Sequence, residues 1–207
     1  MIIKWLGHSS FKIRFKDKII YIDPYSGEYN EIADLILITH SHSDHFSLDI
    51  IKKITNDDTI VVGTSDVISE IAGKVLKNGE KIDLGFIVVE AVPAYNINKK
   101  FHPRGFGNGY ILTINKIKIY HCGDTDLIPE MNLISADLVL IPVGGTYTMD
   151  SHEAIKAIKI ISPKLAIPMH WGNIVGHIED AEHFKEGVES KTNTKVSVLQ
   201  VGEELDL

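Results

Sequence analysis

With 207 residues and a net charge of −7, the chain is long enough for one domain with its own hydrophobic core. The acidic balance disfavours a broad nucleic-acid surface, which is built from lysine and arginine contacts to phosphates. Cys122 is the only cysteine, so no intrachain disulfide can form and a reducing compartment is indicated. No secretory segment and no apolar run of roughly 18 residues is present. We expect one cytoplasmic domain over residues 1–207, without membrane contact.

The first quarter of the chain has the patterns of strands. Residues 2–6 and 11–15 alternate between apolar and polar, and a third apolar stretch covers 19–22. Gly7-His8-Ser9-Ser10 lies between the first two strands, and Asp23-Pro24 ends the third because proline cannot donate to a sheet. The apolar run 35–38 predicts a buried strand.

A dense cluster of metal-ligand side chains follows that strand, in Thr39-His40-Ser41-His42-Ser43-Asp44-His45. In extended backbone, residues two apart point to the same side, so His40 and His42 can bind one ion together. Asp44 and His45 then face a second position nearby. Imidazole and carboxylate ligands suit zinc, iron or manganese.

The middle of the chain alternates helices and strands, which is typical of α/β folds. We predict helices over 48–54 and 66–74, capped by Ser47 and Ser65, with a strand over 59–62 between them. A β pattern returns over 81–94 and is interrupted at Gly85. Residues 95–109 fit no regular element, and loops of this length are often functional.

The second half repeats the order of the first. The apolar runs 110–114 and 117–120, followed by Asp124, resemble 11–15 and 19–22 followed by Asp23. The run 137–141 likewise resembles 34–38, so we infer an internal duplication. Two such halves, each a sheet covered by helices on one side, predict an α/β four-layer αββα sandwich.

The remaining elements complete the pattern. Asp150 and Glu153 predict a capping box for a helix over 151–161. A short strand over 165–169 leads to His170, and a helix over 179–190 and a strand over 195–201 follow. Candidate ligands thus follow three strands, and ligands gather at the carboxyl ends of strands in open α/β sheets.

The spacing H-x-H-x-D-H after a strand resembles the signature of the metallo-β-lactamase-fold hydrolases, and the resemblance covers the whole chain. Gly7-His8-Ser9-Ser10-Phe11, His121-Cys122-Gly123-Asp124-Thr125 and Pro142-Val143-Gly144-Gly145-Thr146-Tyr147 are similar to segments of one branch. That branch contains the ascorbate-6-phosphate lactonase-like proteins and the N-acyl phosphatidylethanolamine phospholipase D.

The resemblance implies two divalent metal ions, with zinc expected and manganese or iron as alternatives. By that resemblance, His40, His42 and Asp124 hold the first metal, and Asp44, His45, His170 and Asp124 hold the second. Asp23 would accept hydrogen bonds that orient the histidine loop.

The sequence departs from the family pattern at one ligand. The family has a later histidine near the end of the strand before residue 96, where this chain has Asn96. His102 follows six residues on and is the candidate replacement, with a solvated histidine or a substrate contact as alternatives. If neither residue binds metal, the first metal position is weak.

The implied activity is hydrolysis of a small ester, lactone or phosphodiester by a metal-activated hydroxide. Asp44 and Asp124 are the leading catalytic candidates, and His8 and Tyr147 are weaker ones. Candidate substrate contacts are Arg104, which suits an anionic substrate, and His102 and Trp171. Two alternatives remain: a non-catalytic metal-binding or sensor protein on the same fold, and a nucleic-acid-processing phosphodiesterase.

Overall fold

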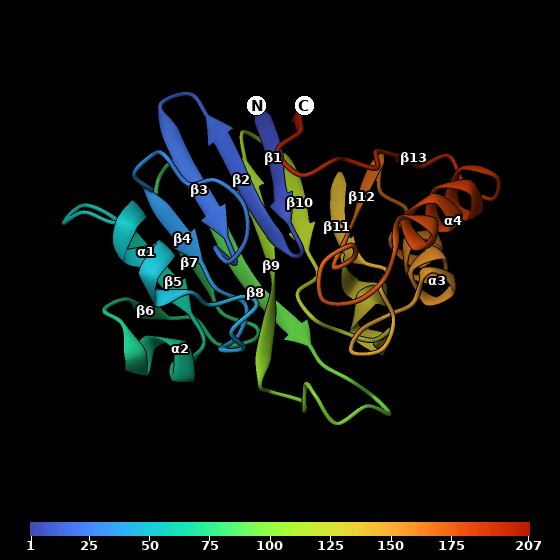
Figure 1. Cartoon of the computed structure of the whole chain (residues 1–207), viewed down its shortest axis with the longest axis horizontal. Helices are drawn as coiled ribbons and strands as arrows, with labels where there is room; N and C mark the ends of the chain where they lie inside the picture. The colour runs from blue at the N-terminus through green and yellow to red at the C-terminus, as the bar shows by residue number, and fades with distance from the viewer. The chain divides into compact units, whose positions relative to one another are not determined.

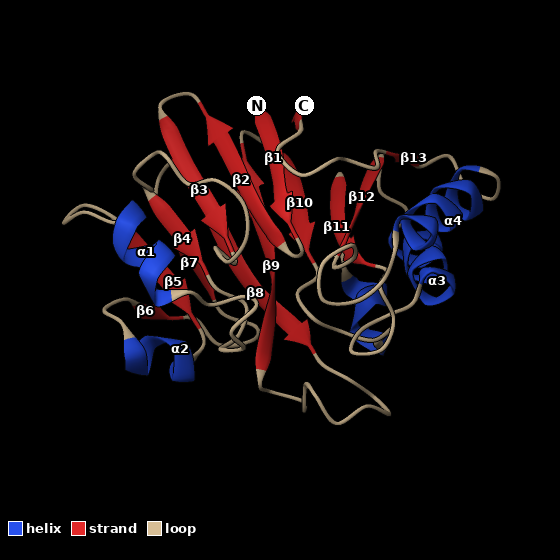
Figure 2. Ribbon diagram, viewed as in Figure 1, coloured by secondary structure: helices blue, strands red, loops and turns tan.

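Each half of the chain contributes a seven-stranded sheet in the computed structural model, which describes residues 1–207. The residues group into two units. Unit 1 comprises Met1–Lys77 and Leu199–Leu207, and unit 2 comprises Asn78–Val198. Figures 1 and 2 show the strands and helices of both units.

The sheet of unit 1 is mixed. The N-terminal strands pair antiparallel, and the pairing becomes parallel from β3 onward. Its strands are, in spatial order, β14 (Glu204–Asp206), β1 (Ile2–Gly7), β2 (Ser10–Phe15), β3 (Lys18–Ile22), β4 (Leu35–Leu37), β5 (Ile60–Gly63) and β6 (Lys74–Val75). All three residues of β4 are buried, as expected for a parallel strand in the middle of a sheet.

Two helices cover the parallel part of this sheet. Helix α1 (Leu48–Ile54) begins at Ser47, whose hydroxyl accepts the N–H of Ile50, which confirms the predicted cap. Helix α2 (Ser65–Glu70) follows β5. Both helices pack into one core cluster, composed of Leu6, Ile19, Tyr21, Tyr29, Ala33, Ile36, Ile38, Ile51, Ile54, Val61 and Val67. Each of its large side chains contributes about 1.5–3 kcal/mol by leaving water.

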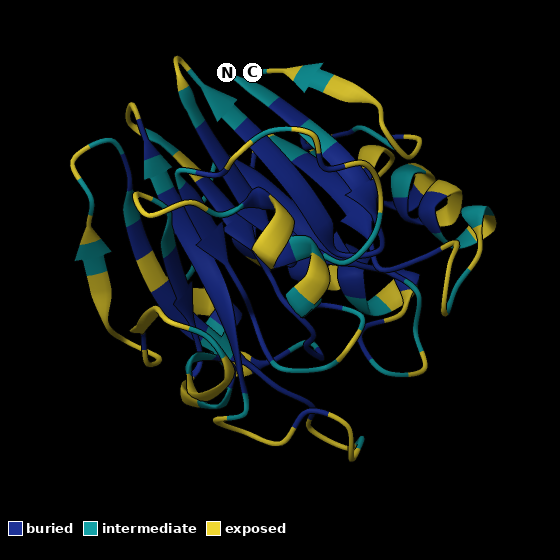
Figure 3. Cartoon of the chain, turned by 60° about the vertical axis from the view of Figure 1, so that its left-hand side comes forward, coloured by how far each residue is buried: buried dark blue, intermediate teal, exposed yellow.

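The sheet of unit 2 has the same kind of arrangement. Its strands are, in spatial order, β7 (Lys81–Asp83), β8 (Val88–Ala94), β9 (Gly107–Ile114), β10 (Ile117–His121), β11 (Leu138–Pro142), β12 (Leu165–Met169) and β13 (Lys195–Val196). Figure 3 shows that buried positions concentrate on the inner strands, whereas helices, loops and short edge strands such as β7 and β14 carry the exposed ones.

The helices of unit 2 are a 3-10 turn, η1 (Pro129–Leu133), and the helices α3 (Ser151–Ile161) and α4 (Ile178–Glu189). The capping box of α3 is confirmed, because Asp150 Oδ1 accepts Glu153 N–H at 2.8 Å and Glu153 accepts Asp150 N–H at 3.2 Å. Helices α3 and α4 approach closely at Gly187. A Cβ there would lie 2.2 Å from Ile155 Cδ1, so only glycine fits without rearrangement.

The two sheets share one topology, which supports the internal duplication. Three antiparallel pairs and then three parallel pairs run from β14 to β6, and the same succession runs from β7 to β13. Single hydrogen bonds recur as well. Asp34 accepts Ile19 N–H at 2.8 Å in unit 1, and Asp137 accepts Lys118 N–H at 3.0 Å in unit 2. Both carboxylates therefore tie the start of one strand to the start of its parallel neighbour.

Two predicted elements need correction, and one strand lies outside the predicted elements. The predicted helix over 66–74 ends at Glu70, and Lys74–Val75 is a strand instead. At Gly73 the backbone passes β5 so closely that a Cβ would lie 2.8 Å from Val61 O, which only glycine allows. The strand predicted over 195–201 ends at Val196, and the short, charged strand β14 was not predicted.

The loop predicted over 95–109 is shorter than expected, because β9 begins at Gly107. Gly107, Asn108 and Gly109 have the composition of a turn, yet they pair with β8. A Cβ at Gly109 would lie 2.9 Å from Cys122 O, so close backbone packing explains this glycine. No helix of the structure has the length and apolarity to cross a bilayer. The single domain and the cytoplasmic location stay predictions.

Candidate metal centre

The histidine loop of unit 1 is anchored at both ends. The N–H of Ile38 donates to Val62 O at 2.9 Å, which extends the β4 pairing up to the loop. Farther on, the carbonyl of His42 accepts the N–H groups of His45 and Phe46 at 2.9 and 3.0 Å. This turn leads directly into α1. The loop is therefore a short segment fixed between a buried strand and a helix.

Asp23 holds this loop from the end of β3. Its backbone is in the left-handed region, with φ 46°, which is a strained conformation for a residue with a side chain. One carboxylate oxygen accepts the backbone N–H of Thr39 at 2.7 Å. The other accepts the hydroxyl of Thr39 at 2.7 Å and lies 2.8 Å from Nδ1 of His45. Asp23, Thr39 and His45 are completely buried.

These contacts decide which ring nitrogens carry hydrogen. A carboxylate only accepts, so His45 must donate through Nδ1. The single hydroxyl hydrogen of Thr39 goes to Asp23, so its oxygen accepts from Nδ1 of His40, which lies 3.0 Å away. Both rings therefore have a lone pair at Nε2, the form in which imidazole binds metal.

The other side chains of the cluster lie beside these two rings. His42 Nδ1 is 3.0 Å from His40 Nε2, and the two ring centroids are 4.6 Å apart. Asp44 Oδ2 lies 3.1 Å from His8 Nε2 and 3.8 Å from His45 Nε2. His8 is held by its own carbonyl, which accepts the indole N–H of Trp5 at 2.9 Å. Unit 1 thus brings His8 and the four predicted loop ligands together.

A second ligand group forms in unit 2 around one oxygen of Asp124. Oδ2 of Asp124 lies 3.0 Å from Nε2 of His170 and 3.3 Å from Nε2 of His102. Asp124 follows β10, and His170 follows β12 with φ 60°. A Cβ at Gly144 would lie 2.2 Å from the carbonyl oxygen of His170. Only glycine at position 144 therefore allows the two backbone segments to lie this close. All three side chains of the group are buried.

The segment after β8 brings His102, and not Asn96, to Asp124. The N–H of Asn96 donates to His102 O at 2.7 Å, which folds the loop back on itself. The Asn96 amide instead reaches Asp126 Oδ1 at 3.0 Å and Tyr147 O at 2.8 Å. Neither this network nor the buried Asp126 was predicted, although Asp126 stands only two residues after Asp124.

The predicted substrate contacts Arg104 and Trp171, and the predicted catalytic candidate Tyr147, have partners of their own. Arg104 lies 2.5 Å from Glu130 Oε1 and 4.9 Å from the ring centroid of Tyr95. The ring of Tyr147 stacks edge-on against Phe101, at 4.7 Å between centroids. Trp171 is buried, and its indole donates to Pro168 O at 3.1 Å. None of these contacts assigns a substrate role.

The other histidines and the cysteine are not among the predicted metal ligands. His152 and His183 contact each other, with ring centroids 4.4 Å apart, on α3 and α4. His121 Nδ1 accepts the N–H of Gly123 at 3.2 Å, beside Asp124. Complete burial raises the pKa of the Cys122 thiol. It therefore stays protonated at neutral pH and is unsuited to act as a nucleophile.

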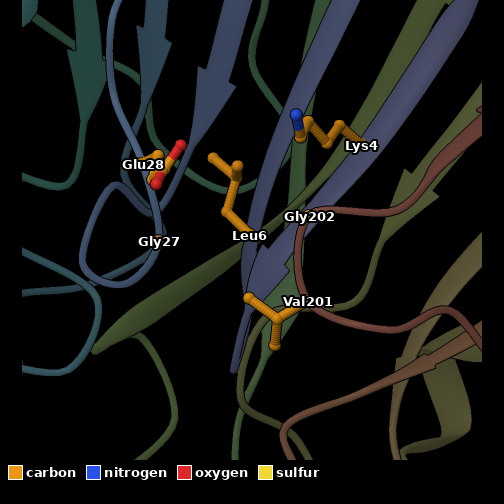
Figure 4. Close-up of a pocket in the computed structure, with 6 residues that line it drawn as sticks. All are labelled: Lys4, Leu6, Gly27, Glu28, Val201 and Gly202. Carbon is orange, nitrogen blue, oxygen red and sulfur yellow. The ribbon is translucent and has the colours of Figure 1, made fainter.

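A hollow in unit 1 is lined by six residues (Figure 4). Its volume is about 350 Å³ and its lining residues are Lys4, Leu6, Gly27, Glu28, Val201 and Gly202. The ammonium of Lys4 lies 3.3 Å from Glu204. None of the predicted metal ligands lines this hollow, so it has no part in the candidate centre.

The model of the beta-lactamase superfamily domain matches residues 2–170. The chain belongs to the beta-lactamase superfamily. Within it, the chain is 36% identical to a UPF0173 metal-dependent hydrolase of Nanoarchaeum equitans, with 100% of both chains covered. A UPF0173 metal-dependent hydrolase of Staphylothermus marinus is 35% identical, over 98% of this chain and 97% of that protein.

The superfamily relationship extends to solved structures. A protein of Parabacteroides distasonis described as a metal-dependent hydrolase has a TM-score of 0.88 and 34% identity, over 95% of this chain and 91% of that one. The predicted superfamily and its α/β fold class are therefore confirmed. The resemblance to the lactonase-like and phospholipase D-like branch stays a prediction.

Proposed function

We propose that this chain is a metal-dependent hydrolase of small esters, lactones or phosphodiesters. The observation that carries the proposal is the pair of imidazole Nε2 atoms that face one carboxylate oxygen of Asp124, at 3.0 and 3.3 Å. Two donor atoms that share a tetrahedral zinc ion lie about 3.3 Å apart, given zinc–ligand distances of about 2.0–2.2 Å. The buried donor set therefore fits a metal ion. UPF0173 relatives described as metal-dependent hydrolases add support.

We assign the ligands of both units to two metals because their motifs match the superfamily. His40, His42 and Asp124 would hold the first metal, and His102 would take the place of the family histidine that the sequence lacks. Asp44, His45, His170 and Asp124 would hold the second. Only nitrogen and oxygen donors are present, a combination that suits zinc, with manganese or iron as alternatives.

Metal ions held by these residues would supply a water that ionises near neutral pH and a positive charge that polarises the bond to be cleaved. The protein residues orient and stabilise the centre. Asp23 and Thr39 keep the hydrogen of both His40 and His45 on Nδ1. His8 keeps Asp44 in place at 3.1 Å, and Asp44 is our candidate for proton transfer to the leaving group. A side-chain nucleophile is unnecessary.

The candidate substrate contacts lie in unit 2. The guanidinium of Arg104 pairs with Glu130, but its side chain is 70% exposed. It retains donors for an anionic group of the substrate, because guanidinium has five N–H donors. Trp171 remains a weaker candidate for a contact to the substrate, and Tyr147 remains a weaker catalytic candidate.

Metal analysis combined with turnover tests the proposal. The purified protein is loaded with zinc or manganese and assayed with p-nitrophenyl acetate, a γ-lactone and bis-p-nitrophenyl phosphate. We expect about two bound metals per chain and hydrolysis of at least one probe class. Asp124→Ala should lose both metal and activity, whereas Asp83→Ala, which changes an exposed carboxylate on β7, should lose neither.

Two results would count against the hydrolase, and a third would count against the ligand assignment. A metal-replete protein that hydrolyses none of the probes would favour a metal-binding or sensor protein. Tight, salt-sensitive binding to RNA would favour a nucleic-acid-processing enzyme, despite the net charge of −7. Retention of metal and activity in Asp124→Ala would show that the ligand assignment is wrong.

A further inference from the structure

The side chain of Asn96 makes four hydrogen bonds at the position where the family pattern has a metal-binding histidine. Its carbonyl oxygen lies 3.0 Å from the N–H of His102 and 3.1 Å from Nδ1 of the His102 ring. Its amide nitrogen donates to Asp126 Oδ1 at 3.0 Å and to Tyr147 O at 2.8 Å. Every hydrogen-bonding position of this buried amide is therefore used.

The partners of Asn96 decide which way its amide faces. A carboxylate and a peptide carbonyl only accept hydrogen bonds, so the NH₂ group must face Asp126 and Tyr147. A backbone N–H only donates, so the carbonyl oxygen must face His102. Three contacts agree on this orientation, and the reverse orientation would leave all three without a hydrogen bond.

The orientation of Asn96 in turn decides the state of the His102 ring. Because the amide oxygen faces Nδ1, that nitrogen must carry hydrogen and donate it. In the neutral ring, Nε2 then has the lone pair, and Nε2 is the atom that lies 3.3 Å from Asp124 Oδ2. The ring therefore presents a metal-binding atom to the carboxylate of the proposed bridging ligand.

We propose that Asn96 is a positioning residue that makes His102 a metal ligand. It sets the hydrogen of His102 on Nδ1 and directs Nε2 toward Asp124. Asn96 therefore does not bind the metal itself but orients the histidine that would. The proposal rests on the proposed function, because it assumes that His102 binds metal. Ligating histidines generally use their other ring nitrogen in such a hydrogen bond.

Asp126 stabilises the orientation of the Asn96 side chain. Its carboxylate is buried and also accepts Ile97 N–H at 2.9 Å and the Lys99 ammonium at 2.6 Å. These charge-assisted bonds are stronger than bonds between neutral groups. The segment from Asn96 to His102 is thus fixed at both ends, by the backbone bond from Asn96 to His102 and by Asp126.

The first test removes the amide. Asn96→Ala should weaken zinc binding by about 10- to 100-fold, the usual effect of losing such a partner, as measured by competition with a chromophoric chelator. In the metal-free protein, ¹⁵N NMR of the His102 ring should show Nδ1–H in the wild type and a mixture of tautomers in Asn96→Ala. Asn132→Ala is the matched control, because this exposed amide donates only to Pro129 O.

A charge exchange separates positioning from general support of the fold. Asn96→Asp places a second carboxylate beside Asp126 and should destabilise the loop. In the double variant with Asp126→Asn, the carboxylate is at position 96 and the amide is at position 126. A carboxylate oxygen at position 96 still accepts from His102. The double variant should recover the Nδ1–H tautomer and part of the zinc affinity, because Tyr147 O still faces a carboxylate oxygen. A merely structural role of Asn96 would not require this recovery.

His102→Ala distinguishes failure of this proposal from failure of the proposed function. If His102→Ala binds zinc as tightly as the wild type, His102 is not a ligand and the ligand set itself is wrong. If His102→Ala loses affinity whereas Asn96→Ala keeps both the affinity and the tautomer, the positioning role alone is overturned.

Discussion

Oδ2 of Asp23 lies 2.8 Å from Nδ1 of His45, and both side chains are completely buried. The same carboxylate binds Thr39 twice, so one residue at the end of β3 orients the histidine loop. This contact lies within unit 1 and rigidifies the ligands before any metal binds.

Asp23→Asn should therefore weaken metal binding by about 10- to 100-fold. The amide keeps the shape of the carboxylate, but its NH₂ group cannot accept from Thr39 or His45. Metal affinity is measured by chelator competition. Asp34→Asn is the control, because Asp34 binds Lys18 and Ile19 away from the loop. Equal affinities for Asp23→Asn and wild type would contradict this role.

His42→Ala should lose bound metal while the fold persists. The side chain is only partly buried and lies on a loop outside the core cluster, so the free energy of unfolding of the metal-free protein should fall by less than about 1 kcal/mol. Metal content is measured by mass spectrometry and stability by urea unfolding. His177→Ala serves as the control, since His177 lies just ahead of α4. Full metal occupancy in His42→Ala would remove it from the ligand set.

Gly187→Ala should destabilise the contact between α3 and α4. The added methyl group meets Ile155 at 2.2 Å, and such overpacking usually costs about 1–3 kcal/mol. This exceeds the roughly 0.5–1 kcal/mol that alanine gains over glycine inside a helix. Adding Ile155→Val removes the clashing Cδ1 and should restore part of the loss in urea unfolding. If the effects of the two changes on the free energy of unfolding simply add, the predicted clash between position 187 and Ile155 is contradicted.

Asp137 should make stability depend on pH only in the acid range. Its hydrogen bond from the Lys118 N–H, and then its bond from Lys164, lower the pKa of this carboxyl. A carboxyl with a lowered pKa in the folded state stabilises the fold above its ordinary pKa, and this contribution is lost as the pH falls through the folded pKa. Asp137→Asn should therefore differ from wild type in stability near pH 6 but less at about pH 2–3. If the difference in stability between Asp137→Asn and wild type does not change with pH, the lowered pKa of Asp137 is not its cause.

The sequence predicts much of the fold because strands and caps have local causes. Buried strands such as β4 and β11 are continuous apolar runs, and the capping box of α3 needs only Asp150 and Glu153 at the right spacing. The repeated order of runs also predicts the repeated topology. The errors occur where a distant segment decides the outcome. The sequence suggests that Gly109 is a turn residue. In the structure, glycine is needed there because a Cβ would lie too close to the carbonyl of Cys122.

The candidate site likewise contains residues that the sequence reveals and residues that only the fold reveals. The proposed ligands His40, His42, Asp44 and His45 are evident because they are close in sequence. The role of Asn96 is not evident, because its partners include Asp126 and Tyr147, which are distant in the chain. Only a folded backbone shows that the loop returns far enough for His102 to meet Asp124.

The shared topology of the two sheets makes Asp23 and Asp124 counterparts, each placed just beyond the middle strand of its sheet. Their carboxylates nevertheless meet imidazoles from opposite edges of the ring, with Nδ1 of His45 facing Asp23 and Nε2 of His170 facing Asp124. The same position in the two sheets thus serves two purposes. The acid of unit 1 is a hydrogen-bond acceptor that aligns proposed ligands, while the acid of unit 2 lies among the proposed ligand atoms.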